Sequence, residues 1–501
     1  MNAKISVLIA LITWLLLIFY YRKSIKKEGA NTIRYFYKKS LGVLNVSSNS
    51  FFFAAGIMIV LLYHSFQLPL SFDESYTFNY FTSRGLYHSL FTYPAPNNHV
   101  LHSVLTNISW ALLGFTHSEL SVRFPALLFC LFSVLFVYKL FLRQNYFASF
   151  FFTAAFLLSP NIIEFAFQAR GYTMQIFFCL VSFYLATRTE IRGLHFKNRL
   201  IFLLFFTIMG LFTSPAYLYT AAAIGIVFIF SFYDAIKRNI NFCLLMVVFW
   251  GLTVLLLYSP IIIHQGISAI VSNKFVLPVN EINIKIIAGH FIDIINYISL
   301  PFGMGWVLLL CFIIIGIKEK KFNYLWLLIT PMLLMIFLKQ LPFLRIFLPF
   351  GILITASVFS SISKIKVCKK TPVVVFFKNR LYGFLLMPLI CCGSVYFFNN
   401  IHEKDDLSSS FEFRKLAPYL SRYDVLTDIS NCDWYMMELT TAHHSLKNKP
   451  EFIRFQNGAT INSADSFVLL TKYRIPEHKL VDSLYSLHHQ TRWIQIGVSP
   501  H

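Results

Sequence analysis

The sequence predicts an all-α polytopic membrane protein, with about 12 transmembrane helices and a small C-terminal α/β domain outside the membrane. Hydrophobic residues make up 57% of the 501 residues and charged residues only 13%, whereas about 25% of the residues of a soluble domain are charged. Apolar runs of bilayer-spanning length, about 17 to 25 residues, recur along the chain. Charged and polar residues return after residue 398. A single water-soluble domain is therefore excluded.

The predicted transmembrane helices follow the apolar runs. They lie near residues 4–21, 51–70, 124–142, 145–160, 172–187, 200–215, 217–233, 242–260, 301–317, 323–338, 343–361 and 381–398. The first run ends at Arg22 and Lys23 without a small-residue cleavage site, which indicates a retained helix rather than a signal peptide. The chain then divides into an N-terminal helix with a basic loop (1–50), a membrane core (51–398) and an outer domain (399–501).

Basic residues are concentrated in alternate loops. The chain has 43 Lys and Arg against 22 Asp and Glu, which gives a formal net charge of +21. In a soluble protein this balance would suggest a nucleic-acid partner, but polytopic membrane proteins collect Lys and Arg in their cytoplasmic loops. The basic stretches 22–39, 188–199 and 364–380 all fall on one predicted side. We therefore assign that side to the cytoplasm and expect no nucleic-acid partner.

The loops on the opposite side contain few Lys and Arg. These predicted outer loops are 71–123, 161–171, 261–300 and 339–345. Within the first of them, the segment 97–115 is apolar but interrupted by His and Asn, so we expect a juxtamembrane helix along the outer surface. Richness in Phe, Ile, Lys and Asn is typical of an A/T-rich bacterial genome. The predicted location is the bacterial inner membrane, with the active site and the C-terminal domain in the periplasm.

The outer domain alternates helix-like and strand-like patterns. Helices are predicted at 411–421, 432–446 and 477–489, and strands at 424–429, 452–455, 466–470 and 493–498. This alternation is typical of a small α/β domain.

The strongest candidate for chemistry is the segment 71–76 (SFDESY), which follows the second predicted helix and carries Asp73 and Glu74. Adjacent carboxylates at the edge of the hydrocarbon layer are costly to desolvate, so their presence there predicts a functional site. The alternative is that Ser71 and Glu74 form a capping box that starts a surface helix. That alternative accounts for Glu74 and leaves Asp73 unexplained.

Amides and imidazoles follow in the same loop as Asn97, Asn98, His99 and His102. Such groups form hydrogen bonds with hydroxyls, which suits recognition of a sugar, although a wet interfacial loop accounts for the composition equally well. His99 and His102 could also bind a metal together with Asp73, but two histidines without a fixed third ligand are weak evidence for a metal site.

Two further outer segments carry charged residues. Glu164 and Arg170 precede Tyr172 and the next predicted helix, and Lys339 and Arg345 flank a short outer turn. Cations at that depth commonly extend their side chains toward lipid headgroups, so their position by itself implies no specific function. The functional alternative is that they bind a lipid-linked phosphate, for which Arg supplies forked donors and Lys a point charge.

These features share one order along the chain and one predicted side of the membrane. The segments are Asp73-Glu74, Pro94 to His99, Gly114 with Glu119 and Arg123-Phe124-Pro125, Ala169 to Tyr172, and Arg345 to Pro349. Together they resemble the GT-C glycosyltransferases, in particular the protein O-mannosyltransferase and aminoarabinose-transferase-like group, over about residues 50–400. The chain departs from that pattern in its extra N-terminal helix and in a short outer tail that identifies no acceptor.

The resemblance implies a GT-C-like core in which a polyprenyl-phosphate donor gives its sugar to an acceptor hydroxyl, with inversion, on the extracytoplasmic face. It implies that Asp73 is the catalytic base, with Glu74 orienting the acceptor or capping the helix, and that Arg345 and Lys339 bind the donor phosphate. The residues expected to bind the substrates are Asn97, Asn98, His99, His102, Glu164, Arg170 and Tyr172. The acceptor, a lipid, glycan or protein, stays open. No cofactor is implied as required, and a divalent metal stays open.

The main alternative is a flippase or transporter, or a polymerase, of lipid-linked saccharides. Transporters often contain inverted repeats and helices broken at the membrane midplane. We recognise no internal repeat, and the unusual residues cluster at one surface, which favours surface chemistry over transit. A polymerase would depend on Arg and His in the loop 261–300, where only His264 and His290 stand out.

Overall fold

The structure is a computed structural model of the chain. It describes residues 8–16, 58–59, 61–63, 65, 70–94, 98–114, 118–142, 152–153, 155–156, 159–187, 195–271, 277–278, 284–298, 305–318, 322–362, 424–427, 452–454, 467–471, 486–490 and 495–498.

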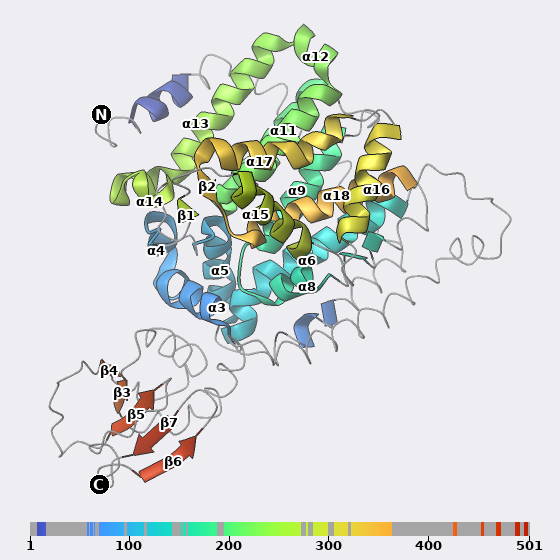
Figure 1. Ribbon diagram of the computed structural model, residues 1–501. Helices are drawn as coiled ribbons and strands as arrows, with labels where there is room; N and C mark the ends of the chain where they lie inside the picture. Colours follow the sequence, from blue (N-terminus) through green and yellow to red (C-terminus); the bar gives the residue numbers. More distant parts are fainter. Residues whose placement is uncertain are drawn as a thin grey trace.

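Long helices occupy the positions of most predicted spans in the described part of the membrane core (Figure 1). They are α6 (Ser118–Leu142), α9 (Tyr172–Thr187), α10 (Phe196–Thr213), α11 (Leu218–Ser231), α13 (Ile240–Gln265), α16 (Gly305–Lys318), α17 (Trp326–Leu338) and α18 (Leu348–Ile362). Three of the described segments are long and apolar enough to cross a membrane: Glu119–Val137, Phe196–Thr213 and Ile240–Gln265. The prediction for 381–398 lies outside the described residues, so the number of spans stays a prediction.

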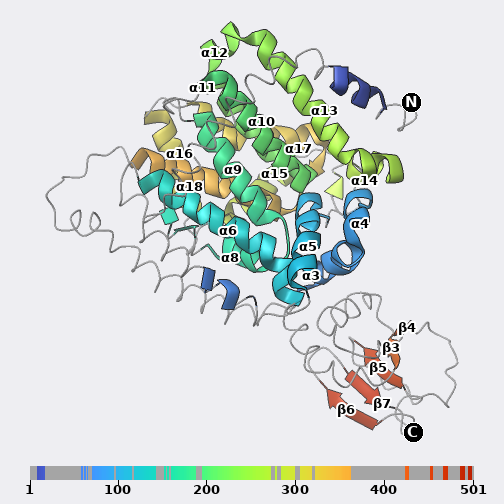
Figure 2. The same ribbon diagram turned by 180° about the vertical axis from the view of Figure 1, so that it is seen from behind.

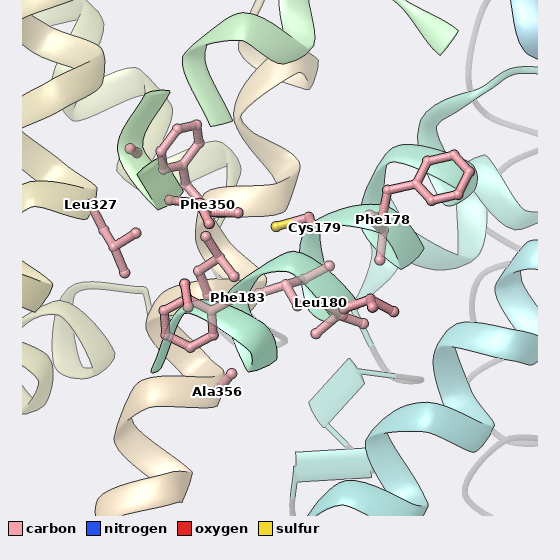
Figure 3. Packing of buried hydrophobic residues seen from close by; sticks show 14 of the residues in the cluster. Phe178, Cys179, Leu180, Phe183, Leu327, Phe350 and Ala356 are labelled. Atoms are coloured by element: carbon pink, nitrogen blue, oxygen red, sulfur yellow. The ribbon is translucent and has the colours of Figure 1, made fainter. Parts of the chain in front are cut away.

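α9 lies at the centre of the helical core. Almost all of its residues are buried, and it contacts α6, α10, α11 and α18. Figure 3 shows Cys179 and Phe183 of α9 on the side of Phe350 of α18 and Leu327 of α17, whereas Phe178 points to the opposite side of α9. Since neighbouring helices surround α9, its position is fixed, and so is the turn that precedes Tyr172.

α13 is apolar like α9, but few of its residues are buried. Apolar side chains such as Leu244, Val247 and Val248 point outward along it, which is the pattern of a helix that faces lipid rather than protein. The N-terminal residues 8–16 pack here, because Trp14 Nε1 donates to Thr253 Oγ1 at 3.1 Å and the indole stacks on Phe249. The extra N-terminal helix is thus placed against α13.

Shorter elements lie where the predicted outer loops were placed. They are α3 (Phe72–Thr77), the π-helical turn η1 (Phe78–Thr82), α4 (Gly85–Phe91), α5 (Val100–Leu113), α8 (Pro160–Phe167), α14 (Ser268–Val271), α15 (Ile284–Tyr297), the two-stranded β1 (Leu277–Pro278) and β2 (Gln340–Leu341), and the 3₁₀ turn η5 (Leu344–Phe347). The loop between α11 and α13 contains α12 (Tyr233–Arg238). α12 and α3 lie at opposite ends of the bundle in both views (Figures 1 and 2).

α5 lies within 97–115, where a helix was expected. Its 14 residues span about 21 Å, less than the hydrocarbon thickness of about 30 Å. Since α11 and α16 also have 14 residues, this length does not distinguish a juxtamembrane helix from a span, and the position of α5 along the outer surface stays a prediction.

Five strands of the outer domain form one mixed sheet in the order β4-β3-β5-β7-β6. The strands are β3 (Asp424–Thr427), β4 (Phe452–Arg454), β5 (Phe467–Thr471), β6 (Ser486–Gln490) and β7 (Gln495–Val498). β3 pairs parallel with β4 and β5, and β7 pairs antiparallel with β5 and β6. The helices predicted at 411–421 and 432–446 lie outside the described residues.

The helix predicted at 477–489 is wrong at its C-terminal end, because β6 occupies residues 486–490. β6 is one of the two edge strands of the sheet, and it pairs with β7, from which only four residues separate it along the chain. A strand partner this close in sequence satisfies the backbone hydrogen bonds that a helix would otherwise have made. Tertiary pairing overrides the local helical pattern here.

Candidate active site

Asp73 and Glu74 lie in the first turn of α3. The helix begins at Phe72, after Ser71 in an extended conformation, and acidic residues in a first turn interact favourably with the helix dipole. α3 continues into the π-helical turn η1, a local irregularity that is frequent near functional sites. Since successive residues of a helix point about 100° apart, the two carboxylates face different surroundings.

Asp73 lies between two arginines. Its Oδ2 atom forms an ion pair with Arg170 Nη1 and a second one with Arg345 Nη1, at 3.1 Å. The Arg170 side chain is fully buried, whereas the side chains of Asp73 and Arg345 are 27% and 30% exposed. Two guanidinium groups beside one carboxylate stabilise its ionised form and leave an excess of one positive charge. The cluster is therefore suited to an additional anion.

Tyr172, the first residue of α9, lies between the same two arginines. The guanidinium carbons of Arg170 and Arg345 are 5.3 and 5.9 Å from the centre of its ring, within the range of cation–π contacts. The rings of His99 and Phe165 pack against the Tyr172 ring, with 4.8 and 4.3 Å between ring centres. The aromatic ring thus helps to hold both cations beside Asp73.

Glu74 is buried, and both of its carboxylate oxygens accept hydrogen bonds. Arg123 donates to Oε1 through Nε at 2.7 Å and to Oε2 through Nη2 at 2.9 Å. The backbone amide of Ala169 donates to Oε1 at 2.7 Å, and that of Ser71 donates to Oε2 at 2.9 Å. Glu74 consequently joins α3 to α6 and to the turn that carries Arg170. These contacts favour the helix-capping alternative for Glu74.

The turn between α8 and α9 places Arg170 and leaves no room for a side chain at Gly171. A Cβ atom at Gly171 would lie 2.4 Å from Thr213 Cγ2 and 3.0 Å from His99 Cβ. The turn is thus wedged between the end of α10 and the residue that precedes α5. Glycine at position 171 is required by this close approach.

The amides and imidazoles of the same loop separate into two groups. Asn98 is fully buried and structural, since its Nδ2 donates to the carbonyls of Ser89 and Thr92 and its Oδ1 accepts from Ser103. His99 Nε2 lies 3.5 Å from Arg170 Nη2, while His99 Nδ1 and both ring nitrogens of His102 have no partner among the described residues. Asn97 lies outside the described residues.

Burial determines the charge of the two histidines. It lowers the pKa of His99 well below its ordinary value, an effect that the nearby His102 and Arg345 reinforce. Burial also lowers the pKa of His102 to about 3. Both imidazoles are therefore neutral near neutral pH. His102 retains both a donor and an acceptor nitrogen for a ligand, whereas His99 Nε2 faces the donating Arg170 guanidinium, which leaves Nδ1 as its donor.

Tyr297, at the end of α15, also reaches the cluster, although no sequence pattern singles it out. It packs with Phe165, Tyr172 and Leu348, and Asn161 Nδ2 donates to its carbonyl oxygen. Burial and the neighbouring Glu164 raise the pKa of its hydroxyl. Glu164 itself is half-buried and accepts from Gln168 Nε2 at 3.2 Å.

Two solved structures share this architecture over nearly the whole chain. Both are of ArnT from Cupriavidus metallidurans. The apo structure matches with a TM-score of 0.54 and 11% identity over 89% of this chain and 97% of the other. The structure bound to undecaprenyl phosphate matches with a TM-score of 0.53 and 10% identity over 90% and 98%. No family model and no curated protein matches the sequence.

The chain has the ArnT fold. The fold implied by the sequence resemblance is thereby confirmed. At about a tenth identity the likeness shows the fold only, so the assignment of residues depends on the geometry of this chain.

Within its ArnT fold, the chain brings Asp73, Arg170, Tyr172 and Arg345 together. Lys339 lies outside this cluster, because it is exposed and makes no contact with Asp73 among the described residues. Its backbone has the left-handed conformation, with φ 51°, at the end of α17. Arg123, Ala169, Gly171 and Tyr297 were not among the predicted site residues. Of these, Arg123 had a signal in the Arg123-Phe124-Pro125 segment, and Ala169 and Gly171 had one in the segment from Ala169 to Tyr172.

Among the described residues, no three His, Cys, Asp or Glu side chains come together as a ligand set for a metal ion. The metal site considered from Asp73, His99 and His102 therefore has no support from the geometry. The expectation that no metal is required stays a prediction.

Proposed function

We propose that the chain is a membrane glycosyltransferase that moves a sugar from a polyprenyl-phosphate donor to an acceptor hydroxyl on the extracytoplasmic face, inverting the anomeric carbon. The observation that carries the proposal is the cluster in which Arg170 and Arg345 flank Asp73. The ArnT fold supports it, because one ArnT structure of that fold has undecaprenyl phosphate bound.

The charges of the cluster match the chemistry of this transfer. The leaving group is already a phosphate, so it needs stabilising cations rather than an acid that protonates it, and guanidinium groups bind phosphate oxygens through forked donors. One carboxylate then suffices to accept the proton of the attacking hydroxyl. A glycosidase would usually need a second carboxyl across the scissile bond. The adjacent Glu74 is engaged with Arg123 and faces another way.

Donor binding would also free the base. In the structure both arginines contact the same Asp73 oxygen. A donor phosphate that takes over these guanidinium groups would release Asp73 Oδ2 to accept a proton from the acceptor hydroxyl. Arg170 and Arg345 are accordingly the proposed donor-phosphate ligands, and His99 and His102 the proposed contacts to sugar hydroxyls.

Asp73→Asn is the direct test of the proposed base. The substitution keeps the size of the side chain and removes its ability to accept a proton, so we expect transfer from a polyprenyl-phosphate donor to fall by about 100-fold or more. The assay is covalent sugar transfer in reconstituted membranes. Asp234→Asn, in the exposed α12, is the matched control and should be unaffected. Near-normal turnover by Asp73→Asn, with an unchanged melting temperature, would exclude Asp73 as the base.

The same membranes separate the transferase from a flippase. Labelled donor is supplied on one face only, together with candidate acceptors. Covalent label on an acceptor supports the transferase, whereas label that crosses the bilayer without a new covalent bond supports the flippase.

A further inference from the structure

The outer loop between α13 and α16 is fastened to the segment that leads to Arg345. β1 of this loop pairs antiparallel with β2, with Leu277 opposite Leu341 and Pro278 opposite Gln340. β2 follows directly after α17, and the 3₁₀ turn η5 that carries Arg345 begins three residues later. The backbone that positions this guanidinium is therefore shared with the outer loop.

α15 adds a second attachment, through His290. Its Nε2 lies 3.0 Å from the carbonyl oxygen of Pro342. Because a carbonyl can only accept, Nε2 carries the proton, in the neutral as well as the charged imidazole. The ring also packs edge-on against Phe347, at 6.3 Å between centres. His290 thus contacts η5 at Phe347 and the backbone just ahead of it at Pro342.

The far end of α15 attaches beyond Arg345. Tyr297 packs against Leu348 and Tyr172, and Ile298 lies so close to α18 that a Cβ atom at Gly351 would be 2.9 Å from Ile298 Cβ. α15 consequently contacts residues on both sides of Arg345.

The guanidinium of Arg345 depends on this backbone for its position. Its side chain is partly exposed, its Nε has no partner among the described residues, and its Nη1 contacts Asp73. In the proposed reaction the phosphate would take over that contact. The guanidinium would then be positioned by the turn on which it lies and by its ring contacts with Phe343 and Tyr172.

We propose that α15 is a strap that holds Arg345 in its phosphate-binding position, with His290 as the positioning residue that fastens it. The inference rests on the proposed function, because it assumes that Arg345 binds the donor phosphate. The docking of the outer loop would then set the affinity for the lipid phosphate without contacting it.

The test compares His290→Phe, which keeps a ring against Phe347 but loses the donor, with His290→Gln, which keeps a donor. His290→Ala is made in parallel, because it removes the donor without adding volume. The full-length protein is titrated with undecaprenyl phosphate in nanodiscs. We expect His290→Phe and His290→Ala to weaken the binding of undecaprenyl phosphate about 2- to 10-fold, as the loss of one hydrogen bond predicts. The affinity of His290→Gln should lie within about twofold of the wild-type value. His264→Phe, an exposed histidine at the end of α13, is the control.

Two readouts separate positioning from a general structural effect. In an Arg345→Ala background, His290→Phe should weaken binding no further, because its effect acts through Arg345. Hydrogen exchange of the amides in 340–347 should accelerate in His290→Phe and not in His264→Phe.

Wild-type affinity in both His290→Phe and His290→Ala, or an equal further loss in the Arg345→Ala background, would overturn the strap. A wild-type chain that does not bind undecaprenyl phosphate would instead overturn the proposed donor. Hydrogen exchange at 340–347 would then decide by itself whether His290 holds this segment.

Discussion

Asp73 and Glu74 show how burial separates two neighbours of the same chemical type. The Glu74 carboxylate is 1% exposed and pairs with an equally buried Arg123, whereas Asp73 is 27% exposed beside two arginines. A saturated, buried carboxylate cannot easily exchange its partners, since each oxygen would be left without a hydrogen bond. A partly exposed carboxylate can accept a new ligand. This difference supports the proposal that Asp73 is the base, whereas the contacts of Glu74 hold the surrounding elements together.

The choice between the two predicted phosphate-binding cations is tested by Arg345→Ala and Lys339→Ala. Arg345 contacts the cluster and Lys339 is exposed outside it. Loss of hydrogen bonds to a charged group should weaken undecaprenyl phosphate binding by about 10- to 150-fold in Arg345→Ala, and Lys339→Ala should change it less than about twofold. Binding is measured by titration, with Arg238→Ala as a control. A larger effect on acceptor than on donor binding would refute the assignment.

The buried pair of Glu74 and Arg123 should contribute to stability rather than to chemistry. Glu74→Gln leaves the guanidinium of Arg123 buried without its counter-charge, so we expect a loss of about 3–5 kcal/mol in the free energy of unfolding. Unfolding in detergent micelles measures it. The double variant Glu74→Gln/Arg123→Gln leaves no unpaired charge. Its loss of unfolding free energy should therefore be smaller than the sum of the losses in the two single variants. Strict additivity would contradict this account.

At the scale of elements, four separate segments determine where Arg170 lies. Glu74 of α3 accepts the Ala169 amide, and His99 before α5 and Thr213 of α10 close around Gly171. α9 starts immediately afterwards and is packed on all sides. A rigid turn of this kind keeps a charged group within the small tolerance that catalysis demands.

Gly171→Ala should therefore reduce transfer while the protein stays folded. The new Cβ would meet Thr213 Cγ2 at 2.4 Å and His99 at 3.0 Å, which displaces the turn and Arg170 with it. We expect a rate loss of about 10- to 100-fold. Thr213→Ser removes the Cγ2 atom but keeps the hydroxyl that donates to Met209, so adding it should recover part of the activity. The transfer assay compares Gly171→Ala with the double variant. If Thr213→Ser recovers no activity, the clash that displaces the turn lies at His99 alone.

At the scale of the molecule, the fold gathers at one end residues that are far apart in sequence. Asp73 and Arg345 are 272 residues apart, and α3 lies at the opposite end of the bundle from α12 (Figures 1 and 2). α12 ends in Lys237 and Arg238, which the charge rule places in the cytoplasm. The site would therefore face outward.

Cysteine labelling tests this orientation. Single cysteines at the exposed positions 84, in the turn before α4, and 237, in α12, are introduced into a chain whose eight native cysteines are replaced. A membrane-impermeant maleimide added to intact spheroplasts should label position 84 and not position 237, and the pattern should reverse in inverted vesicles. Labelling of both positions from the same side would contradict the topology.

Local properties of the sequence determined the membrane class, most helix positions and the acidic candidate at 73–74. Hydrophobicity, charge bias and capping patterns act over a few residues and need no knowledge of distant contacts. Four of the strands in the outer domain were found in the same way, while β6 was missed because its pairing with β7 overrides the local pattern.

Only the tertiary structure decided which charged groups meet. It paired Glu74 with Arg123, placed Arg170 and Arg345 at Asp73, left Lys339 outside the cluster and added Tyr297 from α15. Each of these contacts joins segments that are separated by tens to hundreds of residues, so each depends on how the helices pack. Helix packing is decided by the fit of many side chains at once, which no short stretch of sequence contains.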